Sequence, residues 1–330
     1  MKHGNIGIFI PHLGCPQRCS FCNQNRISGA ARAPSPEEVA RLLEGAVRTP
    51  GFDGAHCEIA FFGGSFTAVD PAYREALLDV AEPFARRGQV AGIRLSTRPD
   101  CLDGPMARHL AARGVTAVEL GAQCMDDGVL AKNRRGHTAE DVRAACRAVR
   151  AAGLELGLQM MTGLPGADRE TDRRTAEAFV ALAPDTVRIY PTLVMRDTEL
   201  CALYEKGAYA PLSLEEAVEQ TAALLRLFDS ARIRVIRVGL HPDESLAEGW
   251  VAGPFHPAFR ELCESRRYAA LLGEALAGLP AGEYRLGVAP GHASKAVGHR
   301  GENRRALAER GQRIKVYEDG AVAPYTIRRM

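Results

Sequence analysis

The chain of 330 residues contains no apolar run long enough to cross a membrane. A spanning helix needs about 18 or more consecutive apolar residues. The first four residues, Met1-Lys2-His3-Gly4, lead straight into an apolar stretch, without the pattern of a signal or transit peptide. We therefore expect a cytoplasmic protein without a membrane partner.

The chain also lacks a second set of closely spaced cysteines or histidines. It has nine cysteines, and only three of them lie close together. An odd number with one tight group indicates reduced thiols and a metal site, not a disulfide framework. We expect no auxiliary iron–sulfur centre, and we expect the scattered cysteines to be small core residues; these are Cys57, Cys101, Cys124, Cys146, Cys201 and Cys263.

The composition is that of a folded globular protein, with 46% hydrophobic and 25% charged residues. The formal net charge is only +2, but the last 48 residues carry ten Arg or Lys against five Asp or Glu. The basic residues are thus concentrated in the tail. The length suggests one large domain and one small domain.

The three clustered cysteines follow the apolar strand expected at residues 6–11. They are Cys15, Cys19 and Cys22, with Phe21 just before the last of them. Three thiolates with the spacing CxxxCxxC can hold three irons of a cubane cluster and leave the fourth iron open for chemistry. The alternative is a zinc loop completed by His12, but structural zinc usually takes ligand pairs from two segments.

This spacing, the preceding strand and the aromatic residue resemble the signature of the radical S-adenosylmethionine (SAM) superfamily. The resemblance implies a [4Fe-4S] cluster, SAM as second cofactor, and a low-potential electron donor such as flavodoxin or ferredoxin. It also implies that the reduced cluster cleaves SAM to a 5′-deoxyadenosyl radical.

The rest of the chain alternates between short apolar strands and helices of ten to eighteen residues. Strands are expected at 57–62, 93–97, 117–123, 155–162, 186–191 and 234–238, each preceded by a helix. This alternation predicts parallel right-handed βαβ units. We expect an α/β fold, a partial (β/α)6 barrel with a small C-terminal α+β module, whose sites lie on the loops after the strands.

Several candidate cofactor contacts follow these strands. Gly63 and Gly64 match the register of the superfamily's glycine motif, and Gln123 ends the fourth strand. Arg134 could clamp the methionine carboxylate through its planar fork, or it could be an exposed arginine at a helix start. Ser96 and Thr97 are candidate ribose contacts or ordinary turn hydroxyls. Two further candidates, Cys124 and Tyr190, could be catalytic, although residues in such positions more often serve packing.

Several segments together resemble the radical domain of the Elongator catalytic subunits, which modify tRNA. They are Glu119–Gln123, Asn133–Thr138, Gly163–Gly166, Ile189–Leu193 and Arg196–Leu200. The Elongator subunits space their cysteines more widely and carry a later acetyltransferase domain. About sixty residues follow Tyr268 here, so the resemblance does not imply carboxymethylation from acetyl-CoA. Anaerobic coproporphyrinogen III oxidases share the cysteine spacing, Gln123 and Arg134, but lack the Tyr-Pro-Thr-Leu segment.

The sequence of the last 48 residues predicts the order strand, helix, GxxG loop, helix and strand. This order resembles the K-homology RNA-binding core, whose GxxG loop clamps nucleotides. The alternative is a small basic cap. The candidate RNA-binding residues are Gly298, His299, Arg300, Gly301, Arg304 and Arg305.

The sequence thus predicts a radical SAM barrel at 1–240, a connecting segment with a helix at 241–282, and a K-homology-like module at 283–330. We expect an enzyme that modifies tRNA or rRNA. The alternatives are a small-molecule radical SAM enzyme related to coproporphyrinogen oxidase, and a non-enzymatic RNA-binding protein with a metal loop.

Overall fold

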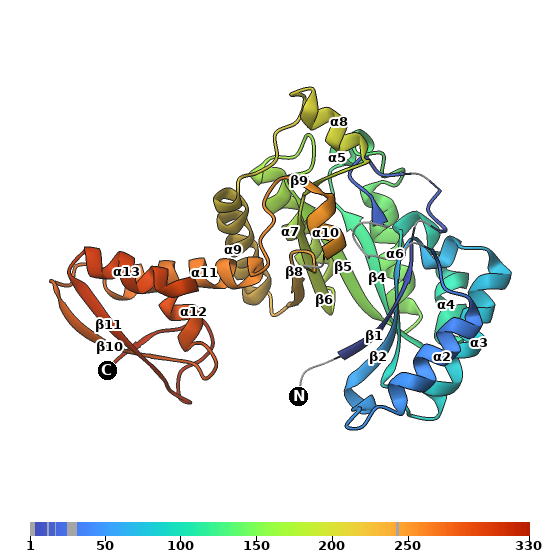
Figure 1. The fold of residues 1–330 in the computed structure, drawn as a ribbon, viewed down its shortest axis with the longest axis horizontal. Coiled ribbons are helices and arrows are strands. Elements are labelled where there is room, and N and C mark those ends of the chain that lie inside the picture. Colours follow the sequence, from blue (N-terminus) through green and yellow to red (C-terminus); the bar gives the residue numbers. More distant parts are fainter. Residues whose placement is uncertain (1–3, 12, 17, 25–31, 242–243) are drawn as a thin grey trace. The chain divides into compact units, whose positions relative to one another are not determined.

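The computed structural model describes residues 4–11, 13–16, 18–24, 32–241 and 244–330, and Figure 1 shows its ribbon. The chain divides into two compact units. The first comprises Met1–Leu212 and Phe228–Pro254, and the second comprises Ser213–Leu227 and Phe255–Met330. The sequence placed its boundaries after residues 240 and 282; that functional division stays a prediction.

The first unit is built on a seven-stranded parallel sheet whose strands follow one another in chain order. This order confirms the predicted partial barrel, because each strand pairs in parallel with the next one in the sheet and the chain between them contains helix. The curled sheet stays open between its first and last described strands. The strands are β1 (Gly4–Ile10), β2 (Cys57–Gly63), β3 (Gly92–Thr97), β4 (Val115–Gln123), β5 (Glu155–Thr162), β6 (Thr186–Pro191) and β8 (Arg234–Val238).

The helices between these strands begin at local capping signals. Ser35 and Glu38 form a capping box, with Pro36 at the first helical position between them, and Thr138 and Asp141 form another. Figure 1 shows α2, α3 and α4 along one side of the sheet. The helices are α2 (Pro36–Val47), α3 (Pro71–Arg86), α4 (Gly104–Ala112), α6 (Ala139–Ala151) and α7 (Arg169–Leu182). None of the described helices is both long and apolar enough to cross a bilayer.

The two faces of this sheet differ in polarity. Alternate strand residues such as Ile59, Ile93 and Leu120 are fully buried in the apolar core. Their neighbours in the sequence, such as Glu58 and Glu119, point to the opposite face because side chains alternate along a strand. The second face is therefore polar, and it carries the candidate site.

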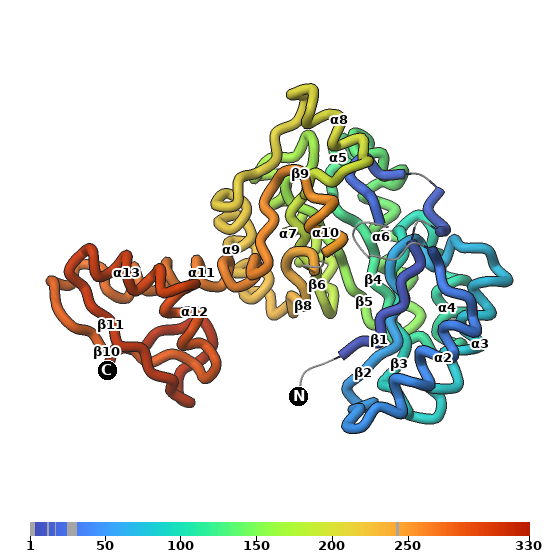
Figure 2. The backbone as a smooth tube through the Cα atoms, in the orientation of Figure 1, coloured from blue at the N-terminus to red at the C-terminus, as the bar shows by residue number. Residues whose placement is uncertain are grey.

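Short elements that the sequence did not predict complete the first unit. A two-stranded antiparallel ribbon pairs β7 (Val194–Met195) with β9 (Trp250–Ala252). Figure 2 traces the backbone of this unit, with β6 and β8 side by side as their pairing requires. The remaining short helices are α5 (Asp127–Lys132), α8 (Glu199–Glu205) and α10 (Glu244–Gly249).

The second unit is a small three-stranded sheet covered by helices. Its sheet has the order β11-β10-β12, with β10 parallel to β11 and antiparallel to β12. The predicted sequence of strand, helix, GxxG loop, helix and strand is confirmed, and the helix expected upstream at 259–277 is α11. The elements are α9 (Leu214–Ser230, whose last residues belong to the first unit), α11 (Phe259–Ala275), β10 (Gly282–Val288), α12 (Ala293–Val297), α13 (Glu302–Glu309), β11 (Gln312–Glu318) and β12 (Arg328–Arg329).

Candidate active site

The cysteine loop follows β1 and is fixed by the residues between its cysteines. The buried Ser20 donates its hydroxyl to Asn133 Oδ1 at 2.9 Å and receives a backbone bond from Leu200 at 2.8 Å. Phe21 packs in a core cluster with Leu164 and Val194. The loop is therefore held at the C-terminal end of α5 and the N-terminal end of α8.

Gly63 and Gly64 bring this loop against the end of β2. Gly64 N–H donates to the Ile10 carbonyl at 2.8 Å, and a Cβ on Gly64 would lie 1.9 Å from the Leu13 carbonyl oxygen. Gly63 has a φ of +113°, and a Cβ there would lie 2.7 Å from the Ile10 carbonyl oxygen. The close contact between the end of β2 and the segment after β1 thus requires glycine at both positions, whether or not a ligand also needs it.

The three thiols are free and influence one another. Burial raises the pKa of Cys15, and the nearby Cys19 raises it further. Burial, with Cys19 and Cys15, raises the pKa of Cys22 to about 12. Arg135 Nη1 donates to Cys19 Sγ at 2.9 Å. Such thiols ionise on coordination, because a bound metal stabilises the thiolates.

A cavity of about 700 Å³ opens beside the cysteine loop on the polar face of the sheet. Of the predicted site residues it brings together the three cysteines, Phe21, both glycines, Ser96, Thr97, Gln123 and Tyr190. Its described lining contains no Asp or Glu but includes five arginines, which are Arg18, Arg98, Arg135, Arg188 and Arg237. The cavity therefore suits anionic groups.

Gln123 occupies a strained position at the end of β4. Its φ is +66°, and the pairing of β4 with β5 shifts register between Leu120 and Gln123. Its Oε1 is buried without a hydrogen-bond partner. A residue other than glycine is strained in this left-handed backbone conformation, and strained residues of this kind concentrate at functional sites. The unpaired oxygen provides an acceptor for a ligand donor in the cavity.

The predicted carboxylate clamp, Arg134, does not line the cavity. It takes the left-handed position that ends α5, with a φ of +53°, and its side chain is 64% exposed. There it pairs with Glu199 at 3.0 Å. The next residue, Arg135, is buried, lines the cavity, and donates to Cys19 and to the Gly121 carbonyl. The geometry thus favours Arg135 for the role that the sequence assigned to Arg134.

Cys124 and Tyr190 have different surroundings. Cys124 is 1% exposed in the core cluster around Phe21, and its Sγ lies 3.4 Å from the Thr175 hydroxyl. It does not line the cavity, so its position suits a packing role. Tyr190 does line the cavity; burial raises the pKa of its phenol, and Arg188 opposes that rise.

Sequence reasoning missed a buried charge network beneath the cavity. Glu119, 1% exposed, forms a double ion pair with Arg188 and accepts from Gln159 Nε2 at 2.9 Å. Arg94 reaches Glu58 at 2.8 Å and Glu155 at 2.9 Å. The available signal was a single charged residue within each of the strands β2 to β6.

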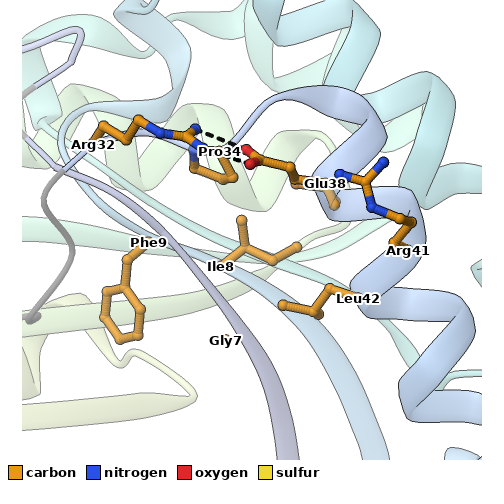
Figure 3. Close-up of a pocket in the computed structure, with 9 residues that line it drawn as sticks. Gly7, Ile8, Phe9, Arg32, Pro34, Glu38, Arg41 and Leu42 are labelled. Carbon is orange, nitrogen blue, oxygen red and sulfur yellow. Dashed lines mark hydrogen bonds and ion pairs between the residues drawn. The ribbon is translucent and has the colours of Figure 1, made fainter.

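A second hollow, of about 490 Å³, lies between β1 and α2 (Figure 3). Its lining includes Ile8, Leu42 and the ion pair of Arg32 with Glu38 at 2.8 Å. Its described lining contains no cysteine, and its one carboxylate, Glu38, is paired with Arg32. This hollow therefore has no chemistry comparable to that of the larger cavity.

The GxxG loop of the second unit forms a tight turn, closed by Gly301 N–H donating to the Gly298 carbonyl at 2.8 Å. His299 turns inward: its side chain is 18% exposed, its Nδ1 lies 3.2 Å from a carboxylate oxygen of Glu261, and its backbone N–H donates to the Ser265 hydroxyl. Arg300 is exposed, as are Arg304 and Arg305 on α13. The exposed basic residues in the loop and on the helix after it are thus arginines, whereas His299 is turned inward.

An open parallel half-barrel with three cysteines after its first strand defines the class of protein. The family model of the radical SAM superfamily matches residues 9–179, and that of the radical SAM C-terminal domain matches residues 184–269. The chain belongs to the radical SAM superfamily.

Similar proteins include the tRNA uridine(34) acetyltransferase of Methanocaldococcus jannaschii, 30% identical over 49% of this chain and 34% of the relative. Human Elongator complex protein 3 is 30% identical over 52% of this chain and 35% of its own length. This chain thus spans about a third of those relatives. Among solved structures, archaeal Methanocaldococcus infernus Elp3 with an N-terminal deletion gives a TM-score of 0.64 at 22% identity, over 84% of this chain and 64% of that one. Coproporphyrinogen III oxidase from Escherichia coli gives a TM-score of 0.50 at 18% identity, over 70% of this chain and 53% of that one. These two structures share the fold.

The cofactors of the superfamily are a [4Fe-4S] cluster and SAM, and the described residues fit both. Among those residues, no three His, Cys, Asp or Glu form a group that could share a single metal ion. A cubane does not need such a group, because each of three irons takes one thiolate. His12, the proposed fourth zinc ligand, lies outside the described residues. The unpaired Gln123 Oε1 and the arginines offer partners for the polar groups of SAM.

Proposed function

We propose that this chain is a radical SAM enzyme that modifies tRNA. The observation that carries the enzymatic part is the placement of Cys15, Cys19 and Cys22 at one end of a cavity that also contains Gln123 and Arg135. The name of the similar tRNA uridine(34) acetyltransferase supports tRNA as the substrate class, and uridine as the base. The cytoplasmic location expected from the sequence is part of this proposal.

The chain's own residues would hold and orient the cofactors. The three cysteines would ligate the cluster, and Arg135, already bound to Cys19, would place its guanidinium beside the methionine carboxylate. Gly63 and Gly64 would offer backbone groups, and Gln123 an acceptor. When bound, the reduced cluster and SAM supply a 5′-deoxyadenosyl radical.

Tyr190 is the candidate for a residue that acts on the substrate. It lies on β6 in the same cavity, next to Arg188. Its raised pKa keeps the phenol protonated, so it can donate a hydrogen bond at neutral pH. Cys124 is a weaker candidate, because its thiol is buried among Thr175 and the core. Ser96 and Thr97 stay candidate ribose contacts.

The second unit is proposed to bind the RNA. Its GxxG turn and the exposed Arg300, Arg304 and Arg305 support a K-homology-like contact with phosphates. Replacing Arg304 and Arg305 together by glutamine should weaken RNA binding and flatten its salt dependence by roughly 0.7 per lost phosphate contact. The matched control is Arg143→Gln with Arg147→Gln on α6, which removes the same charge from exposed helix positions of the first unit.

Two measurements test the function. Anaerobically reduced protein should convert SAM to 5′-deoxyadenosine, which a non-enzymatic metal-loop protein would not do. The modified nucleosides of tRNA should differ between cells with and without the gene. Unchanged tRNA together with no RNA binding would favour the alternative of a small-molecule enzyme related to coproporphyrinogen oxidase, because the arginine-lined cavity also suits a substrate with several carboxylates.

A further inference from the structure

The small sheet of the second unit packs its helices against one face. Leu286 of β10 and Ile314 of β11 share a core cluster with residues of α11 and α13, and Figure 1 shows these helices along one side of the two strands. Side chains alternate along a strand, so the residues between these core positions point to the opposite face. This open sheet face carries five exposed residues, which are Glu283, Arg285, Arg313, Lys315 and Tyr317.

Two carboxylates of the open sheet face are already used by ion pairs. Glu283 pairs with Lys315 at 3.3 Å. Asp319 lies over Gly287, where it would contact a Cβ, and pairs with Arg328. Neither carboxylate is therefore free to neutralise a further cation on this face.

Two guanidiniums remain as a positive surplus. Within residues 244–330, all of which the structure describes, neither Arg285 nor Arg313 forms an ion pair with a carboxylate. They lie on neighbouring strands, because Glu283 is in register with Arg313 and Arg285 with Lys315. The face thus offers two adjacent cations to an anionic partner.

An aromatic ring lies beside this surplus. Tyr317 is 37% exposed, and the guanidinium carbon of Arg285 lies 4.9 Å from the centre of its ring. Unpaired nucleobases stack on tyrosine rings and on guanidinium planes, whereas duplexes hide their bases. A ring between cations therefore fits a single strand of nucleic acid.

The cations could instead protect an edge strand. β11 lies at the edge of its sheet, and charged side chains on such strands prevent pairing with another chain. This role needs charge on the edge strand only. It accounts neither for the exposed ring of Tyr317 nor for Arg285, which lies on the central strand β10.

We propose that the open sheet face binds a single-stranded segment of RNA, with Arg285 and Arg313 on phosphates and Tyr317 stacked on a base. This inference rests on the proposed action on RNA and adds a second contact surface to the GxxG loop. The two surfaces belong to different sides of the sheet, because α13, which carries Arg304 and Arg305, packs on the covered face.

The test measures binding of the full chain to a labelled oligouridine, and to an abasic strand of the same length, over a range of salt concentrations. Arg285→Gln with Arg313→Gln should weaken binding of both strands about tenfold or more. It should also reduce the slope of log affinity against log salt by about 1.4, which is about 0.7 for each lost phosphate contact.

Tyr317 gives a separate signature, since stacking releases no counterions. Tyr317→Leu should weaken oligouridine binding about fivefold or more, the smallest loss expected for one stacked base, with the salt slope unchanged. Its affinity for the abasic strand should equal that of the wild type. Tyr317→Phe should bind both strands like the wild type because it keeps the ring.

Matched controls come from the first unit. Tyr204→Leu removes a ring that is also 37% exposed, from α8, and should change neither affinity nor slope. Arg143→Gln with Arg147→Gln removes two exposed positive charges from α6 and should likewise have no effect.

Wild-type affinity and slope in both open-face variants, in a protein that binds oligouridine, would overturn the surface and leave the GxxG loop as the RNA contact. Equal losses on the uridine and abasic strands in Tyr317→Leu would refute the stacked base. Self-association of the double arginine variant with undiminished RNA affinity would assign the charges to protection of the edge. A wild type that binds no RNA would refute the RNA function together with this surface, whereas its conversion of SAM to 5′-deoxyadenosine would retain the radical enzyme.

Discussion

The choice between two adjacent arginines gives the sharpest test of the site. Arg135 lines the cavity and donates to Cys19, whereas Arg134 is mostly exposed and pairs with Glu199. We expect Arg135→Gln to weaken SAM binding by about 1.5–3 kcal/mol, the usual loss for a hydrogen bond to a charged group. This corresponds to about 10- to 150-fold in the dissociation constant.

Arg134→Gln is the matched control, since it removes the same charge one residue away. It should change SAM affinity less than twofold and should cost at most about 1 kcal/mol of stability, as exposed ion pairs do. Arg135→Lys should fall between these variants because it keeps the charge but loses the planar fork. The assay is equilibrium dialysis of labelled SAM against anaerobically reconstituted protein.

Iron content decides how the result is interpreted. Arg135 contacts Cys19, so each variant must first be shown to hold the wild-type amount of iron. If Arg135→Gln loses the cluster, Arg135→Lys becomes the measured variant. A fully loaded Arg135 variant with wild-type SAM affinity, or a large loss in Arg134→Gln, would refute the assignment.

Three further predictions concern the cluster, the loop contact and pH. Alanine at Cys15, Cys19 or Cys22 should abolish binding of about four irons, whereas Cys146→Ala in α6 should leave the iron content unchanged; stoichiometric zinc in protein purified without oxygen would contradict the cluster. Gly64→Ala should cost about 1–3 kcal/mol and loosen the cysteine loop, because the new Cβ would meet the Leu13 carbonyl; Gly45→Ala in open space on α2 is the control in denaturant unfolding. Burial lowers the pKa of His137 to about 4, with Nε2 3.1 Å from the Ala122 carbonyl. The unfolded histidine takes up a proton near pH 6.5 while the folded one stays neutral, so the free energy of unfolding should fall by about 1.4 kcal/mol per pH unit as pH drops from about 6.5 toward 4. His137→Asn should flatten that slope, and an unchanged slope would exclude His137 as its source.

Local signals made the fold predictable from the sequence. Ser35-Pro36 and Thr138 start helices through bonds to residues three positions later, so the information lies within a few residues. The alternation of apolar strands with helices then determines a parallel sheet by general topological rules. The cysteine spacing predicted the position of the candidate cluster for the same reason.

The choice of cavity arginine was not predictable in this way. Asn133, Arg134 and Arg135 end a short helix, and the sequence does not show which of them takes the left-handed conformation. The structure assigns it to Arg134, and Arg98 holds the Arg135 carbonyl from another strand end. The register shift of β4 against β5 that places Gln123 likewise depends on pairing with a neighbouring strand. The same holds for the register shift of β8 against β6 that places Arg237. Contacts between distant segments decide all three positions.

The buried network explains why the polar face of the sheet needs its charges. Replacing buried ion pairs by well-packed apolar residues often stabilises a protein, whereas removing one partner typically costs about 3–5 kcal/mol. Apolar side chains at Glu119 and Arg188 would therefore favour the fold alone, but they would remove the guanidinium beside Tyr190 and the acceptor for Gln159. Glu119 holds both of these cavity-lining side chains at once, so its main contribution is to their orientation and not to the stability of the sheet. The parallel strands supply the rigid frame, and the charges beneath the cavity supply the position of the groups that line it.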